Sequence, residues 1–200
     1  MHDKRYILIH KPYGMLSQFS GEETDLLIGQ LAKFPKDVYP VGRLDKDSEG
    51  LLLLTNDNAL KTYILEPKNK ISKTYFVQVD GDITDKAIAQ LSAGLININH
   101  KGKLIKVGKA KVMKIKDPDF EERSNPVRFR KNIPTSWISI TITEGKNRQV
   151  RKMTAAAGFP TLRLVRVAIT GLTLEDLNDG LVQEMSKKEI YSKIGFFESK

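Results

Sequence analysis

Residues 42–56 read GRLDKDSEGLLLLTN, so a highly charged segment runs directly into an apolar one. The apolar run at 51–54 is bounded by Gly50 and by the turn-forming pair Asn56-Asp57, which predicts a short buried strand. The segment before it carries the carboxylates of Asp45, Asp47 and Glu49. Functional side chains are often placed on a loop that a rigid strand supports.

Three interpretations of this charged loop compete. The acids at 45, 47 and 49 and Gly50 match positions one, three, five and six of a calcium-binding EF-hand loop. Leu53 and Asn56 then fall at positions nine and twelve, and the bidentate acid is missing, which argues against calcium. The loop is therefore either an acidic structural turn or the carrier of a nucleophilic or acid/base carboxylate.

The hydrophobic pattern of the rest of the chain predicts interleaved strands and helices. Strands are expected at 6–9, 51–55, 74–79, 137–143 and 162–169, and helices at 24–34, 58–65, 84–93 and 148–157. Residues 95–116 alternate apolar and lysine side chains, as twisted antiparallel strands do, and 117–135 reads as an irregular excursion. Without a steady strand–helix–strand rhythm, the expected fold is α+β, with a mixed, largely antiparallel sheet and flanking helices.

Composition excludes several classes of protein. The 200 residues include no cysteine, which removes disulfides, thiolate metal sites and thiol nucleophiles, and the three histidines are far apart in sequence. The N-terminal stretch is too charged for a signal peptide, and no apolar run approaches the length of a membrane helix. We expect a soluble cytoplasmic protein with no membrane partner.

The net charge of +9 is clustered in the second half of the chain. Seven lysines and no acid lie in 101–116, and six basic residues stand against the single acid Glu144 in 141–170. Further cations between them are Arg123, Arg128, Arg130 and Lys131. Such clusters predict a polyanionic partner that binds through its phosphates, with strong salt dependence.

Residues 144–153, EGKNRQVRKM, run from a strand end through Gly145 into the predicted helix. The spacing places Arg148, Arg151 and Lys152 on one helical face, where they could hold a phosphate or a carboxylate. An arginine within about 4–6 Å lowers the pKa of an aspartate by about 1–3 units and keeps it ionised. Taken alone, the helix is equally typical of an ordinary basic surface.

Together these motifs resemble the type A pseudouridine synthases, which are named for the small ribosomal subunit. The charged loop and its strand resemble the catalytic signature, and KPYG at 11–14, KTY at 73–75 and 144–153 resemble the other motifs in the family's order. Residues 133–137 and 158–164 look most like the family's type E members, which are named for the large ribosomal subunit. The resemblance implies a pseudouridine synthase domain over 1–186, with a cleft between two interleaved subdomains, no S4 module, and a tail at 187–200.

The resemblance also implies roles for individual residues. Asp45 would be the nucleophile, Tyr75 would stack on the flipped uracil and assist deprotonation at C5, and Arg151 would pair with the aspartate. Substrate contacts are expected from Lys11, Arg43, Lys73, Lys146, Arg148 and Lys152. No cofactor and no metal ion are expected, since the reaction has no net redox change.

The implied activity is isomerisation of a uridine to pseudouridine in ribosomal RNA, with 23S rRNA as the expected partner and no obligate protein partner. Asp45 could form an adduct at C1′ of the ribose or abstract a ribose proton to give a glycal. Alternatives are a non-catalytic rRNA-binding or assembly protein, a metal-dependent nuclease using Asp45, Asp47 and Glu49, and a sibling synthase acting on another rRNA or tRNA uridine. Loops such as 117–135 would decide that substrate choice.

Overall fold

The computed structural model describes residues 3–127 and 133–197, which fall into two compact units. The first unit takes residues from 1–71 and 166–200, and the second comprises 72–165. Strand β11 (Thr161–Ile169) therefore contributes residues to both. The cations Arg128, Arg130 and Lys131 of the predicted polyanion surface lie outside the described residues.

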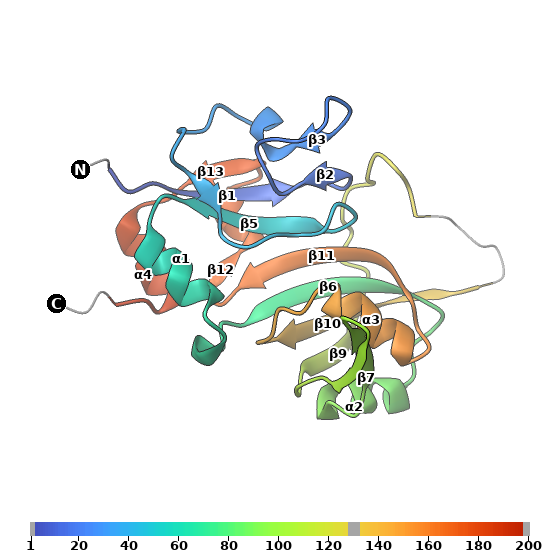
Figure 1. The fold of residues 1–200 in the computed structure, drawn as a ribbon. Helices are drawn as coiled ribbons and strands as arrows, with labels where there is room; N and C mark the ends of the chain where they lie inside the picture. The colour runs from blue at the N-terminus through green and yellow to red at the C-terminus, as the bar shows by residue number, and fades with distance from the viewer. Residues whose placement is uncertain (1–2, 128–132, 198–200) are drawn as a thin grey trace. The chain divides into compact units, whose positions relative to one another are not determined.

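An antiparallel sheet forms the centre of the first unit (Figure 1). Its strands follow the order β13 (Val182–Glu184), β1 (Tyr6–Lys11) and β5 (Glu49–Thr55). Short strands add β4 (Tyr39–Pro40) to β5 and β12 (Leu172–Thr173) to β11, and β2 (Met15–Leu16) pairs with β3 (Leu26–Leu27) in a separate parallel ribbon. In the register of β1 and β5, Lys11 lies opposite Gly50.

Strand β5 is buried on both faces, which explains why its sequence is apolar without alternation. Leu51 and Leu53 belong to one hydrophobic cluster, and Leu52 and Leu54 belong to another. At about 25 cal/mol per Å² of apolar area, four fully buried leucines make this strand a major source of stability. The loop that precedes it is consequently fixed at a rigid end.

Two short helices of the first unit lie side by side, α1 (Asn58–Leu65) and α4 (Lys187–Ile194) (Figure 1). Asp57 caps α1 by accepting from the amide of Leu60, and Ser186 caps α4 in a capping box. Ile190 and Ile194 of α4 join the cluster that contains Leu51 and Leu53. The segment 187–197, expected as a tail, thus packs on the first unit as a helix and a short extension.

The second unit also contains an antiparallel sheet, with the order β6 (Lys73–Asp80), β10 (Thr135–Ile142) and β9 (Lys111–Ile115). A hairpin of β7 (Asn97–His100) and β8 (Lys103–Lys106) accompanies it. Its helices are α2 (Asp85–Ala93), capped by Thr84 and ended by Gly94, and α3 (Gln149–Ala156). In both units most strand pairs are antiparallel, so the α+β expectation is confirmed.

The helix expected at 24–34 is wrong. Leu26 and Leu27 instead pair in parallel with Met15 and Leu16, and a single 3-10 turn follows at Ile28–Gln30. Ile28 is fully buried in the hydrophobic cluster that contains Leu52 and Leu54, and Leu31 and Phe34 pack against that cluster. The apolar side chains of this segment therefore bury themselves from a folded loop and not from a helix. Gly29 lowers the helical propensity of this stretch, and tertiary packing decided its conformation.

Within the described ranges, none of the helices has the length and hydropathy that a membrane crossing requires.

Candidate active-site loops

Asp45 lies in the loop between β4 and β5, close to the rigid end of the buried strand. Its side chain is half-buried, while Arg43 and Lys46 beside it are exposed and Leu44 is inserted into the protein. The amide of Ser48 donates to the carbonyl of Asp45 at 3.0 Å and closes a turn. The carboxylate is therefore held on an ordered loop with access to solvent, as a reacting group requires.

A second loop fastens this one in place. Ser17 Oγ donates to the carbonyl of Leu44 at 2.8 Å and accepts from its amide at 3.0 Å. The amide of Gly14 donates to the carbonyl of Lys46 at 2.8 Å. Backbone groups on both sides of Asp45 are thus bonded to residues 14–17, at the end of the KPYG motif and just after it.

Lys11 is expected to contact substrate, but its side chain is fully buried, and this placement favours a structural role. Its ammonium donates to the carbonyls of Pro12 at 2.9 Å and Met15 at 2.7 Å. Burial lowers the pKa of Lys11 to about 8, although the carboxylates of Glu49, Asp47 and Asp45 act to raise it. Lys11 therefore shapes the turn that holds the Asp45 loop and brings a positive charge close to it.

Gly50 and Arg166 form a close backbone contact at the start of β5. Gly50 has φ +104°, and a Cβ there would lie 2.3 Å from the carbonyl oxygen of Arg166. The Arg166 side chain is 4% exposed and donates from Nε to the carbonyl of Leu51 at 2.7 Å. The sequence predicts Arg166 as part of a polyanion surface, and that interpretation is wrong because its charge is buried.

Arg163 is also predicted to belong to the polyanion-binding surface, and it too is buried. Only 9% of it is exposed, and its guanidinium carbon lies 5.4 Å from the centroid of the Phe120 ring. By contrast, all seven lysines of 101–116 are exposed. The basic surface of the second unit is therefore carried by this lysine run, in which Lys114 forms an ion pair with Asp82.

Tyr75 and Lys73 lie on β6, in the second unit. Tyr75 is opposite Ile140 of β10 and is only 9% exposed, whereas Lys73, opposite Ile142, is half-buried. A phenol on a central, well-paired strand has little conformational freedom. That suits a stacking platform, although the same placement is also typical of a core tyrosine.

The third motif begins with an ordered polar cluster around Glu144. Its carboxylate accepts from the amide of Gly108 at 2.7 Å and from Gln149 Nε2 at 3.0 Å, and it forms an ion pair with Lys146. Burial alone would raise the pKa of Glu144, but these donors hold that pKa below its ordinary value. Lys146, expected to contact substrate, is already bound to Glu144.

Helix α3 follows, and it begins one residue later than expected. Arg148 is the N-cap residue, with φ 52° in the left-handed region, so it does not share a helical face with Arg151 and Lys152 as predicted. The buried face of α3 consists of Gln149, Val150, Met153 and Thr154. Arg151 and Lys152 are half-buried and Arg148 is exposed.

The structure thus gathers the candidate residues into two groups. The first unit brings together Lys11, Arg43 and Asp45, and the second carries Lys73, Tyr75, Lys146, Arg148, Arg151 and Lys152. The ion pair between Asp45 and Arg151 would join the two units, and it stays a prediction. Ser17 could not be predicted from the sequence, because its role depends on a long-range contact that no local pattern signals.

As for metal ions, the described part of the chain holds no group of three histidine, aspartate or glutamate side chains suited to binding one.

Comparison with known proteins defines the class of protein to which these loops belong. The model of the RNA pseudouridylate synthase family matches residues 5–156, which include the Asp45 loop, Tyr75 and the third motif. A solved structure described as a pseudouridylate synthase superposes with a TM-score of 0.74 at 26% identity, covering 97% of this chain and 75% of that one. The chain belongs to the RNA pseudouridylate synthase family and is an RNA-modifying isomerase.

Within that family, the chain is similar to proteins named ribosomal large subunit pseudouridine synthase E. The protein of that name from Vibrio vulnificus is 46% identical over 184 residues, covering 92% of this chain and 76% of the relative. The one from Xanthomonas campestris is 46% identical over 176 residues, covering 87% and 91%. A ribosomal large subunit pseudouridine synthase B from Bacillus subtilis is 32% identical, covering 92% and 69%. The expected family and the likeness to its type E members are confirmed, and these relatives are named for the large ribosomal subunit, so the small-subunit type A label is corrected.

Proposed function

We propose that this enzyme converts a uridine of 23S ribosomal RNA to pseudouridine, with Asp45 as its nucleophile. The observation that carries the proposal is the placement of Asp45: a half-buried carboxylate on a loop fixed by β5 and by the double hydrogen bond between Ser17 and Leu44. The ribosomal substrate is supported by relatives at 46% identity whose names refer to the large ribosomal subunit.

The proposed chemistry suits a carboxylate. Uracil leaves the ribose at N1, turns over and rejoins through C5, so C1′ becomes cation-like as the first bond breaks. A carboxylate stabilises such a centre, as in glycosidases. The electrons of the broken C1′–N1 bond stay with the uracil and form the new C1′–C5 bond, and the proton lost from C5 is replaced at N1. Hence the reaction requires no oxidant or reductant.

Side chains of the second unit complete the proposed site. Tyr75 is the stacking platform that keeps the detached uracil in place, and Arg151 pairs with the Asp45 carboxylate. Arg43 and Arg148 are exposed and suited to RNA phosphates, and the half-buried Lys73 and Lys152 are further proposed substrate contacts. Lys146 acts through Glu144, to which it is bound.

RNA affinity is proposed to come from the exposed lysines of 101–116. A uridine in folded RNA must be flipped out of its stack, which costs a few kcal/mol, and phosphate contacts on either side of it offset that cost. The site of action follows from the substrate: ribosomal RNA and its assembly intermediates are found in the cytoplasm.

The test compares two neighbouring aspartates. Asp45→Asn should keep the fold and the RNA affinity but lower turnover by at least about 10³-fold, as loss of a nucleophile does. Asp47→Asn, which removes the same charge from the same loop, should retain most activity. Pseudouridine is detected by carbodiimide treatment and primer extension on unmodified rRNA. Turnover by Asp45→Asn would refute the assignment.

Mapping pseudouridine in the rRNA of cells with and without this protein identifies the target. Loss of one site in 23S rRNA is the expected result. Loss of a site in another RNA would show a sibling synthase, and loss of none would show that rRNA is not the substrate.

A further inference from the structure

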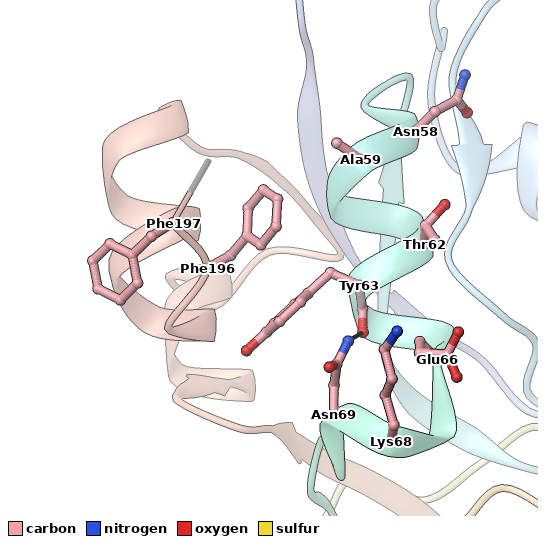
Figure 2. A pocket seen from close by; sticks show the side chains of 9 residues that line it. All are labelled: Asn58, Ala59, Thr62, Tyr63, Glu66, Lys68, Asn69, Phe196 and Phe197. Atoms are coloured by element: carbon pink, nitrogen blue, oxygen red, sulfur yellow. Dashed lines mark hydrogen bonds between the residues drawn. The ribbon is translucent and has the colours of Figure 1, made fainter. Parts of the chain in front are cut away.

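An open groove of about 680 Å³ runs along α1 in the first unit (Figure 2). Ala59, Thr62 and Tyr63 of α1 line one side, and the C-terminal extension after α4 contributes Phe196 and Phe197. Figure 2 shows the Phe196 ring turned toward α1 and the Phe197 ring turned away from it at the rim. None of these residues takes part in the proposed catalytic site.

Two aromatic side chains of the groove, Tyr63 and Phe196, are held by ring contacts, and a third, Phe197, is exposed. The rings of Tyr63 and Phe196 are 4.9 Å apart, and Phe196 also lies 4.9 Å from Tyr191 of α4, which holds it against the protein. Phe197 is 84% exposed, the largest exposed fraction among the large hydrophobic side chains of the described residues. Flat, preorganised ring faces are the feature on which nucleobases stack.

Polar groups at one end of the groove add to this pattern. Asn69 donates from Nδ2 to the carbonyl of Tyr63 at 2.8 Å, which directs its amide, and Lys68 is exposed beside it. Across 58–70 and 187–197 there are six lysines and two glutamates. The charge of these two segments is therefore complementary to a polyanion.

We infer that this groove binds a single-stranded segment of the substrate RNA, with bases against the aromatic rings and phosphates near Lys68. The inference rests on the proposed function, since it takes the RNA that carries the target uridine as the ligand. An apolar protein partner fits less well, because lysines outnumber acids in the two segments that form the groove, although its lining itself holds one of each, Lys68 and Glu66, and its end is polar.

Asp45 comes before β5 and α1 begins after it, so the start of α1 lies at the far end of a strand about 20 Å long. The residues that line the groove do not belong to the Asp45 loop, and the groove is therefore not assigned to the target uridine. It holds nucleotides that flank the target and so contributes to the choice of site.

Substitutions at Ala59 test the charge of the ligand. Ala59 is exposed on α1, where glutamine, glutamate and lysine are all good helix formers. Ala59→Gln measures the effect of bulk alone. Relative to it, Ala59→Glu should raise the Kd for a long 23S rRNA fragment about 5-fold, and Ala59→Lys should lower it. Equal Kd values for the three variants would overturn the inference.

Substitutions at Phe197 and Lys68 test stacking and phosphate contact. Phe197→Leu should raise the Kd about 5- to 10-fold while Phe197→Trp retains affinity, because stacking requires a ring rather than apolar bulk. Lys68→Gln should reduce the slope of log K against log salt by about one. Thermal melting should be unchanged, since both side chains are exposed.

Two further measurements separate the possible outcomes. On a stem-loop too short to reach the groove, all of these variants should form pseudouridine at the wild-type rate, whereas on the long fragment Ala59→Glu, Phe197→Leu and Lys68→Gln should be slower. Absence of pseudouridine on both RNAs would refute the proposed function, and the Kd series would still report on the groove. Self-association in sedimentation that Phe197→Leu abolishes, with no change in Kd, would overturn the inference and show a dimer interface instead.

Discussion

Ser17 and Leu44 are joined by two hydrogen bonds, from the serine hydroxyl to the leucine carbonyl and from the leucine amide to the hydroxyl oxygen. Both residues are buried, and Leu44 immediately precedes Asp45. One side chain therefore satisfies both backbone groups of the residue that precedes the proposed nucleophile. Through this pair the segment after the first motif positions the charged loop.

Ser17→Ala should lower both stability and turnover. It leaves a buried amide and carbonyl of Leu44 without their partner, at a cost of about 1–3 kcal/mol in the free energy of unfolding. Because the loop is loosened, kcat should fall while KM changes little. Ser17→Thr keeps the hydroxyl and should recover most of kcat. Urea denaturation and single-turnover kinetics measure the two effects, and a KM effect alone would contradict this role.

Gly50→Ala should be far more destabilising than Gly14→Ala. Both glycines have positive φ, at +104° and +80°, so alanine at either position has a backbone cost of about 1–2 kcal/mol. Only at Gly50 would the new Cβ also collide with backbone, the Arg166 carbonyl oxygen at 2.3 Å, whereas nothing lies within 4 Å at Gly14. Thermal melting of the two variants measures the difference, and equal losses would contradict the contact.

Lys11→Met should change the pH dependence of stability above pH 8. The pKa of Lys11 is lowered to about 8 from an ordinary 10.5, so the folded protein loses this proton before the unfolded chain does. Wild-type stability therefore gains a contribution that grows as pH rises from about 8 to 10.5. The variant lacks the titrating group and should lack that rise. Denaturation by urea across this range tests it, and a constant difference between the proteins would contradict it.

Tyr191→Phe should weaken the protein at neutral pH and reduce its sensitivity to acid. Asp57 is buried, and although burial alone would raise its pKa, hydrogen bonds from Tyr191 at 2.7 Å and Tyr6 at 2.8 Å hold that pKa below 3.8. A depressed pKa contributes stability that is present above about pH 4 and is lost as pH falls through the folded value.

Removing the Tyr191 hydroxyl should cost about 1–3 kcal/mol at pH 7, as expected for a hydrogen bond to a charged group. The difference from wild type should shrink as the pH falls below about 4. Tyr39→Phe is the matched control. Tyr39 is 55% exposed, so removal of its hydroxyl should leave the free energy of unfolding unchanged. If the difference between Tyr191→Phe and wild type is the same in acid as at neutral pH, Asp57 is not its cause.

Much of the fold could be predicted because local patterns matched it. The apolar run at 51–54, the alternation at 74–79 and the helical spacing of 58–65 and 84–93 are short-range signals, and each produced the expected element. The segment 24–34 failed because its apolar spacing fits a helix and a folded loop equally well. Its pairing with residues 15–16 is a contact that the segment's own sequence does not encode.

The candidate site shows the same division. Asp45, Tyr75 and the third motif could be selected because their motifs, taken together and in order, resemble those of a known family, whereas residue types alone left the function of the charged loop open. What each lysine and arginine does could not be read in this way. Lys11 and Arg166 are buried and Lys146 is bound to Glu144, whereas Arg148 is exposed, although all four look like RNA-binding cations in the sequence.

Most of the strands and helices and the basic character of the chain follow from the amino-acid sequence, since they depend on residue types and on spacings of a few positions. The choice of Asp45 as candidate nucleophile came from the resemblance of its motif to a known family. Tertiary structure decided which cations reach solvent, that Ser17 fastens the Asp45 loop, and that α4 brings aromatic rings beside α1. Burial and long-range hydrogen bonding are properties of residues distant in the chain, and only folding brings those residues together.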